Sequence, residues 1–270
     1  MDLNISDLYR IAIWLFMAGA VLSLVLSRLP KFCLLFANLT ALIAAATLAL
    51  ASLGKLCAGG GTPLTLWLIQ PTFPLFSIAM KVDDLSAFFL LSLAILTFCV
   101  SLFSIGYLGH YIGKRRIGLF HFLYLSFILS MILVFSAADS LFFYLVWEGM
   151  SLVSYFLVVF ETEKEENQRA GTLYIIMTHL ASSCLLIAFL LIYSYTGSFA
   201  MSGDTSALPL HIKNITFALL LIGFGTKAGV IPFHIWLPYA HPAAPSNVSA
   251  LMSGIMIKTA IYGLVRFILG

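Results

Sequence analysis

Two ionisable side chains lie inside stretches that are otherwise apolar enough to sit in lipid. Glu148 falls in the run 141–160 (LFFYLVWEGMSLVSYFLVVF), and Lys227 falls in the run 215–231 (ITFALLLIGFGTKAGVI). Ionisable groups at hydrocarbon depth are costly and are kept mainly where they face a cavity or a partner. A carboxylate and an amine on two different helices can relay protons, so this pair indicates proton-transfer chemistry.

Each of the two residues also has a plain structural interpretation. Glu148 could be a buried carboxyl group hydrogen-bonded to a serine or to backbone of another helix, and Lys227 could extend from a helix end to the membrane surface. Against the second reading, Gly223, Gly225 and Gly229 surround Lys227. Backbone freed at membrane depth is tolerated only in a protein-lined or wet cavity. The sequence therefore predicts an interrupted helix with the lysine at the break.

Five further residues are candidates for the same chemistry. Lys258 lies in the middle of an apolar run, too deep to reach the surface, and is expected to be a proton station. His234, in PFHIWLP, could link Lys227 to Lys258 because histidine titrates near neutral pH, or could cap backbone groups. His121 and His179 are each open to a relay, a haem-ligand or a structural role, and His241 is expected to be structural.

Composition places the chain in the membrane. Of its 270 residues 61% are hydrophobic and only 9% are charged, with a mean hydropathy of +1.06, whereas soluble domains are about 25% charged. The four cysteines form no CxxC motif, so we expect packing roles and no metal, Fe–S or haem c site in this chain. The basic residues follow the loops and do not form a nucleic-acid patch.

The expected fold is all-α, with about eight membrane-spanning helices. A span needs roughly 20 apolar residues. The first segment follows an acidic start and is longer than a signal-peptide core, so it is expected to be a retained helix. Only 57–84 is long enough for additional structure outside the membrane. The segments are 8–27, 32–56, 85–108, 117–137, 140–160, 171–195, 214–231 and 248–268.

Lysine and arginine in the loops predict the orientation. Seven lie in the loops after the first, third, fifth and seventh segments, and five lie on the opposite side. Because cytoplasmic loops are enriched in these residues, the KRR sequence at 114–116 is expected in the cytoplasm and both termini outside. The expected location is the inner (cytoplasmic) membrane.

Several stretches together resemble one known family. DDLSAFFLL, SLFSIGYLGHY, WEGMSLVSYFLV and GTKAGVIPFHIWLPYAHPAAPSNVSALMSGIMIKTAIYG are similar to the antiporter-type proton-translocating subunits of respiratory complex I, Mrp antiporters and membrane-bound hydrogenases. The segment AHPAAPSNVSALMSGIMIKT is most similar to the large membrane subunit of hydrogenase-4 and formate hydrogenlyase. The resemblance covers the third to eighth segments, and the chain corresponds to the N-terminal part of such a subunit.

The resemblance implies roles by position. Glu148 matches the glutamate that pairs with the lysine of the interrupted helix, Lys227 matches that lysine, Lys258 matches the lysine that passes protons on, and His234 matches the histidine after the break. Residues 1–110 would hold three N-terminal helices and residues 111–270 one five-helix repeat. The family's second, inverted repeat is absent from this sequence, so another chain is expected to supply it if this one is complete.

The resemblance also implies what lies outside the chain. Other membrane subunits and a peripheral redox arm would be partners, and Fe–S, flavin or nickel–iron centres would belong to those partners. The chain itself would be a non-redox, ion-translocating subunit. Three alternatives remain: an Mrp-type cation/proton antiporter subunit, a haem-binding electron carrier using His121 and His179, and an incomplete fragment without independent activity.

Overall fold

The computed structural model describes residues 4–59, 61–69, 77–161, 163–201 and 208–269. Long helices dominate this part of the chain, as the all-α expectation requires. The elements are α1 Ile5–Val25, η1 Leu26–Arg28, α2 Pro30–Ala58, β1 Leu64–Ile69, β2 Ile78–Val82, α3 Asp84–Tyr107, η2 Leu108–Tyr111, α4 Ile117–Ser136, α5 Ser140–Val158, α6 Glu165–Thr196, α7 Leu210–Ala228, α8 Leu237–Ala243, α9 Ser246–Leu251, η3 Met252–Met256, α10 Ile257–Leu264 and η4 Val265–Leu269.

The chain is a multi-pass membrane protein. Seven helices of the described part are long and apolar enough to cross a bilayer, and they correspond to seven of the eight predicted segments. The remaining segment, 214–231, forms α7. That helix is not among the seven, although it has the same length of 19 residues as α5, because polar residues that include Lys213 and Lys227 make it less apolar.

Helix ends follow local sequence signals. Asp83 caps α3 by accepting a hydrogen bond from the backbone N–H of Ser86, and Asp139 caps α5 by accepting from two backbone N–H groups. Pro30 opens α2 at a position where a missing N–H costs nothing. Gly197 ends α6 in the left-handed conformation (φ +67°) that glycine adopts readily. These caps fix where each span begins and ends.

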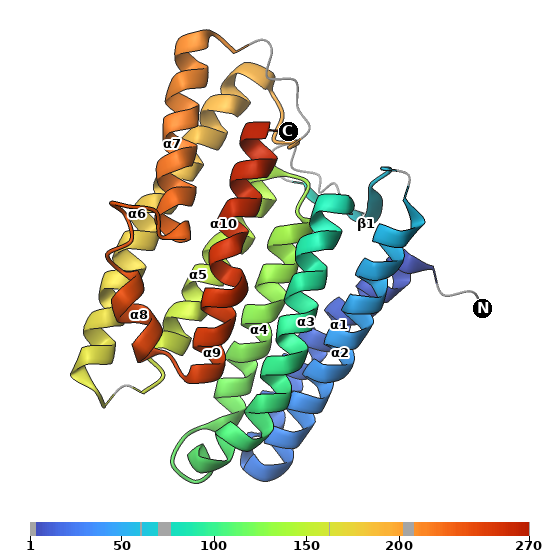
Figure 1. Cartoon of the computed structure of the whole chain (residues 1–270), viewed down its shortest axis with the longest axis vertical. Helices are drawn as coiled ribbons and strands as arrows, with labels where there is room; N and C mark the ends of the chain where they lie inside the picture. Colours follow the sequence, from blue (N-terminus) through green and yellow to red (C-terminus); the bar gives the residue numbers. More distant parts are fainter. Residues whose placement is uncertain (1–3, 60, 70–76, 162, 202–207, 270) are drawn as a thin grey trace.

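Helices α1 to α4 form one part of the bundle, and α5 to α8 lie beside it (Figure 1). Helix α2 packs on α1 and α3, α4 packs on α1 and α5, and α6 packs on α5 and α7. The α1–α2 and α3–α4 turns lie together at the lower end in Figure 1, and the described C-terminal end lies at the upper end. The loops therefore divide between two ends, as expected for membrane-spanning helices.

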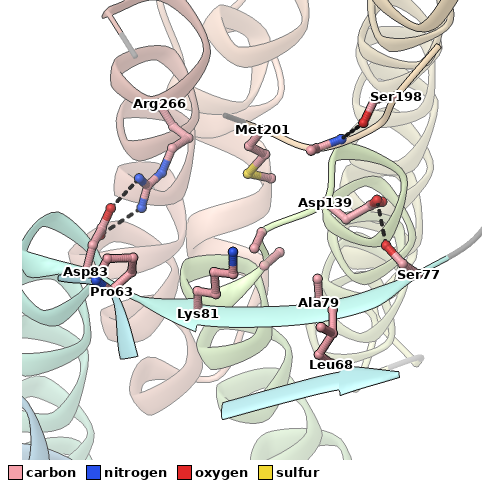
Figure 2. A pocket seen from close by; sticks show the side chains of 13 residues that line it. Pro63, Leu68, Ser77, Ala79, Lys81, Asp83, Asp139, Ser198, Met201 and Arg266 are labelled. Atoms are coloured by element: carbon pink, nitrogen blue, oxygen red, sulfur yellow. Dashed lines mark hydrogen bonds and ion pairs between the residues drawn. The ribbon is translucent and has the colours of Figure 1, made fainter. Parts of the chain in front are cut away.

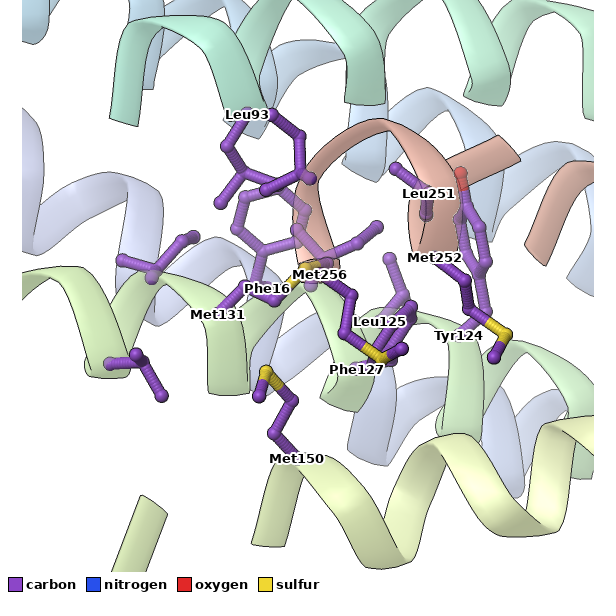
Figure 3. Close-up of a cluster of buried hydrophobic side chains, with 14 of the residues drawn as sticks. Phe16, Leu93, Tyr124, Leu125, Phe127, Met131, Met150, Leu251, Met252 and Met256 are labelled. Atoms are coloured by element: carbon purple, nitrogen blue, oxygen red, sulfur yellow. The ribbon is translucent and has the colours of Figure 1, made fainter. Parts of the chain in front are cut away.

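Large apolar side chains fill the centre of the bundle. Figure 3 shows Phe16, Phe127, Met131, Met150 and Met256 meeting from α1, α4, α5 and the segment η3. All five are buried. Unbranched methionine fits irregular gaps, which suits the region where α9 changes to the π-helical turn η3 before α10.

The segment 57–84 holds the additional structure that its length suggested. Strands β1 and β2 pair antiparallel at the upper end of the bundle, with an irregularity in register between Thr65 and Trp67. A pocket of about 490 Å³ lies beside this hairpin (Figure 2). At its edge Arg266 donates to the Asp83 carboxylate, which ties the end of the chain's last described helical segment to the start of α3.

Candidate functional site

Helix α7 is interrupted immediately after Lys227. It ends at Ala228, and Gly229 takes the left-handed conformation with φ +74°. The N–H groups of Gly229 and Val230 return to the carbonyls of Thr226 and Gly225, which is the Schellman arrangement that ends many helices. Helix α8 resumes below the break, as Figure 1 shows. The predicted interruption of the helix is therefore present.

The break is supported by a side chain from the following segment. The indole Nε1 of Trp236 donates to the carbonyl of Thr226 at 2.8 Å, and Trp236 is fully buried. A carbonyl released at a helix end needs such a partner when no water is available. The indole thereby helps hold α7 and the region before α8 in a defined arrangement around Lys227.

Lys227 is buried, with 1% of its surface exposed. Its Nζ donates to the hydroxyl oxygens of Ser151 on α5 and Tyr174 on α6, both at 2.8 Å. The ammonium also lies 5.9 Å from the centre of the Trp147 ring and 5.0 Å from that of Tyr174. Two neutral hydroxyls and two aromatic faces thus surround the ammonium group, and each hydroxyl can both donate and accept a hydrogen bond.

The hydroxyl contacts continue beyond Lys227. The Tyr174 hydroxyl lies 2.6 Å from Ser154 Oγ, and Ser154 donates to the carbonyls of Met150 and Ser151. Tyr174 also contacts Met256 Sδ at 3.7 Å, which connects the site to the segment η3. A continuous hydrogen-bonded series therefore runs from Lys227 through Tyr174 to Ser154.

Glu148 lies close to this series but points to a different partner. Its Oε2 is 3.5 Å from Nε2 of His179 on α6, and its buried Oε1 has no hydrogen-bond partner among the described residues. No ion pair joins Glu148 to Lys227 in the part of the chain that the structure describes. Ser151, which accepts the hydrogen bond from Lys227, stands three residues after Glu148 on the same face of α5.

Close helix packing positions Lys227 against α6. A Cβ atom on Gly223 would lie 2.4 Å from Leu185 Cδ2 and 2.9 Å from the carbonyl oxygen of Ala181. Only a residue without a side chain lets α7 approach α6 this closely. Gly223 stands one helical turn before Lys227, so the contact fixes the height at which the lysine meets Tyr174.

The structure separates Lys258 and His234 from the Lys227 hydrogen bonds. Lys258 is exposed on the surface of the bundle, and its Nζ donates to the carbonyl of Ser253 in η3. His234 lies in the interruption between α7 and α8 with an exposed side chain that forms no hydrogen bond to a described residue. A link from Lys227 to either residue would need water or movement.

The remaining histidines differ in their surroundings. Buried His121 has Nδ1 3.0 Å from the carbonyl of Ile117 and Nε2 3.1 Å from the Asn38 amide nitrogen. This geometry requires Nδ1 to donate and Nε2 to accept, which favours the structural interpretation of His121. His241 is half-buried beside Trp236, with Nδ1 3.4 Å from Ser249 Oγ.

Three residues of the site were not expected from the sequence. Ser151, Ser154 and Tyr174 are ordinary residue types, and apolar helices contain many like them. The one available signal was that Ser151 follows Glu148 by three residues, which places the two on the same face of a helix. Only the contacts of Ser151 and Tyr174 with Lys227, and of Ser154 with Tyr174, distinguish the three from packing residues.

Comparison with known proteins relates the chain to one family. Residues 137–270 match the family described as "NADH:quinone oxidoreductase/Mrp antiporter, TM", and residues 67–116 match "NADH-Ubiquinone oxidoreductase (complex I), chain 5 N-terminus". The chain is 39% identical over 197 residues to hydrogenase-4 component B of Escherichia coli K12, covering 73% of this chain and 29% of that protein.

Two further similarities extend the comparison. NADH-ubiquinone oxidoreductase chain 4 of Metridium senile is 32% identical over 214 residues, covering 75% of this chain and 41% of that protein. A chain of the membrane-bound sulfane sulfur reductase, an archaeal respiratory membrane complex, superposes with a TM-score of 0.83 at 21% identity, covering 95% of this chain and 52% of that one. The chain thus spans less than half of these curated relatives and about half of the structural one.

The fold defines a polytopic, all-α membrane protein. The chain belongs to the family of antiporter-like membrane subunits shared by complex I-like, Mrp and hydrogenase complexes.

Proposed function

We propose that the chain is a proton-translocating membrane subunit of a hydrogenase-type or NADH-quinone-oxidoreductase-like complex. The observation that carries the proposal is the buried Lys227 at the α7 break, hydrogen-bonded to Ser151 and Tyr174. Ionisable groups at this depth belong to functional pathways far more often than to packing. The family of the chain supports the same function.

The proposed relay has two arrangements of Glu148. In one, its carboxylate pairs with His179, as the 3.5 Å contact indicates. In the other, a side-chain rotation brings it toward Lys227, across the turn of α5 that carries Ser151. The amine keeps its proton more readily beside a carboxylate and releases it more readily when the carboxylate leaves. Alternation between the two arrangements would load and unload Lys227.

From Lys227 the proton would leave through water in the interruption that contains His234 and continue to Lys258. Lys258 is exposed on an apolar helix, and a lone ammonium facing lipid is costly. We therefore place a further protein element, from another chain or from more of the same polypeptide, against this face. The five-helix repeat proposed for residues 111–270 would end at that contact.

The partners in this proposal are other membrane subunits and a peripheral redox arm that holds the Fe–S, flavin or nickel–iron centres. Hydrogenase-4 component B and the archaeal respiratory complex support a setting of this kind. The lower end in Figure 1, with the basic α1–α2 and α3–α4 turns, would face the cytoplasm, and both termini would lie outside.

The test is to replace Lys227 in the complete complex. Lys227→Ala is expected to abolish redox-driven proton uptake in inverted membrane vesicles while electron transfer by the redox arm continues. Lys213→Ala, an exposed lysine of the same helix, is the matched control and should pump normally. Full pumping by Lys227→Ala would overturn the proposal. Ion transport that requires sodium and no electron donor would favour the Mrp-type function.

A further inference from the structure

A second pocket lies at the basic end of the bundle, away from Lys227. It has a volume of about 670 Å³ and is formed where the α1–α2 turn meets the α3–α4 turn. Its basic lining consists of Lys114, Arg115 and Arg116, and its apolar lining includes Leu24 and Leu119. The site is concave, with cationic side chains at one side and exposed leucines at the other. Such a site is suited to bind an amphiphile, a molecule with one charged end and one apolar end.

The cations of this pocket are available to a ligand. Arg115 is paired with Glu163, whereas Lys114 and Arg116 are exposed and form no ion pair with a described residue. Arg28 at the end of η1 and Lys31 in the first turn of α2 add further positive charge nearby. The site therefore carries an excess of positive charge that its own acidic residues do not neutralise.

The backbone around the pocket is held in place. A Cβ atom on Gly118 would lie 2.5 Å from the Ser23 carbonyl oxygen and 2.5 Å from Ser27 Cβ, so the beginning of α4 packs directly on the end of α1. This contact keeps the 114–116 sequence beside Ser27 and Pro30, which also line the pocket. The basic side chains are thus presented from a defined position.

Exposed apolar side chains also lie at the α1–α2 turn next to the pocket. Val25 is 70% exposed, Leu29 is 60% exposed and Phe32 is 56% exposed. Large apolar residues at the end of a membrane-spanning bundle contact acyl chains. Basic groups at this level attract anionic headgroups, and basic pockets between helices bind them. The site thus offers basic groups for a phosphate headgroup and apolar groups for acyl chains.

We propose that this pocket binds an anionic phospholipid, with its phosphate between Lys114 and Arg116 and its acyl chains along α1 and α4. The bound lipid would join the α1–α2 and α3–α4 turns. The site is independent of the proton relay, since none of its lining residues touches Lys227 or Glu148.

The test uses the purified full chain, in its complex, after detergent delipidation. Thermal stability is measured with added cardiolipin, phosphatidylglycerol or phosphatidylcholine, and retained lipid is measured by native mass spectrometry. The anionic lipids are expected to raise Tm and phosphatidylcholine is not. The double variant Lys114→Gln/Arg116→Gln should bind them roughly 30-fold more weakly, since each basic residue near an anionic headgroup contributes about a fivefold effect.

Two controls separate the site from general charge. Lys81→Gln/Lys213→Gln removes the same charge from the opposite end and should keep the full rise in Tm, and the charge-conserving Lys114→Arg/Arg116→Lys should also keep it. An unchanged rise in the Gln variant, or an equal loss in the opposite-end control, would overturn the proposal. If inorganic phosphate alone reproduces the effect, the ligand is free phosphate and the lipid assignment is wrong.

Discussion

The ammonium of Lys227 and the hydroxyl of Tyr174 are joined by a 2.8 Å hydrogen bond between α7 and α6. The lysine is almost completely buried and the tyrosine is fully buried. The tyrosine hydroxyl continues to Ser154, so we propose Tyr174 as a further member of the relay that exchanges a proton with Lys227 without a carboxylate. It gives Tyr174 a specific role in the proposed relay.

Tyr174→Phe should slow proton translocation about tenfold, because it removes one hydrogen-bonding hydroxyl, worth roughly 1–1.5 kcal/mol, from the relay. The ring that lies beside Lys227 is kept, so folding should be preserved. Proton uptake by vesicles that contain the complete complex is the measurement. Tyr239→Phe removes an exposed hydroxyl and should have no effect. Equal rates in both variants would show that Tyr174 is only a packing residue.

Glu148→Gln should abolish proton uptake, since an amide keeps the shape of the side chain but cannot carry the proton or alternate in charge. The change in thermal stability should be small because Oε1 already has no described partner. Glu166→Gln, at an exposed site of α6, is the control in the same vesicle assay. Retained uptake by Glu148→Gln would mean that the glutamate is structural.

His179→Gln should lower the rate of proton uptake, because it removes the imidazole whose Nε2 lies 3.5 Å from Glu148 Oε2 and with it one of the two proposed arrangements of Glu148. His211→Gln, at an exposed position near the start of α7, should keep the wild-type rate in the same vesicle assay. Identical rates for His179→Gln and wild type would contradict the alternation of Glu148.

Gly223→Ala should lower the free energy of unfolding by roughly 1–3 kcal/mol, because the added methyl group overlaps Leu185 and forces α6 and α7 apart. Gly225→Ala is a matched control on the same helix, since its nearest new neighbour lies at 3.9 Å. Gly225→Ala should leave the free energy of unfolding unchanged or raise it slightly, because alanine favours the helical conformation. Thermal unfolding in detergent distinguishes the two. A larger loss from Gly225→Ala would contradict the packing argument.

Asp83 gives a stability effect with a defined pH dependence. Burial acts to raise its pKa, but hydrogen bonds from Arg266 and from the Ser86 backbone outweigh burial and lower the pKa to about 2. A carboxyl group whose pKa is depressed in the folded state stabilises above its unfolded pKa, and this stabilisation is lost as the pH falls toward the folded pKa. The difference in Tm between wild type and Asp83→Asn should therefore be constant above about pH 5 and narrow from pH 4 toward 2. Glu166→Gln removes an exposed carboxylate, and its Tm should stay close to that of the wild type over the whole pH range.

The sequence alone predicted the helical spans well, because burial in lipid demands long apolar runs that composition reveals directly. It also predicted the interruption beside Lys227, although Gly223 and Gly225 remain inside α7 and only Gly229 takes part in ending the helix. Seven of the eight segments returned as long apolar helices, and the eighth is the broken one. The segment 57–84, marked only as additional structure, is in part a hairpin, whose short strands the sequence did not reveal.

The partners of the ionisable residues were decided by tertiary structure. The sequence could mark Glu148 and Lys227 as unusual, but hydrocarbon depth makes any buried charge unusual, whatever it contacts. Which hydroxyl meets Lys227, that Glu148 turns to His179, and that Lys258 reaches the surface all depend on helix rotation and on close approaches such as that of Gly223. Rotation is set by the packing of many small and apolar side chains at once, and no local pattern contains that information.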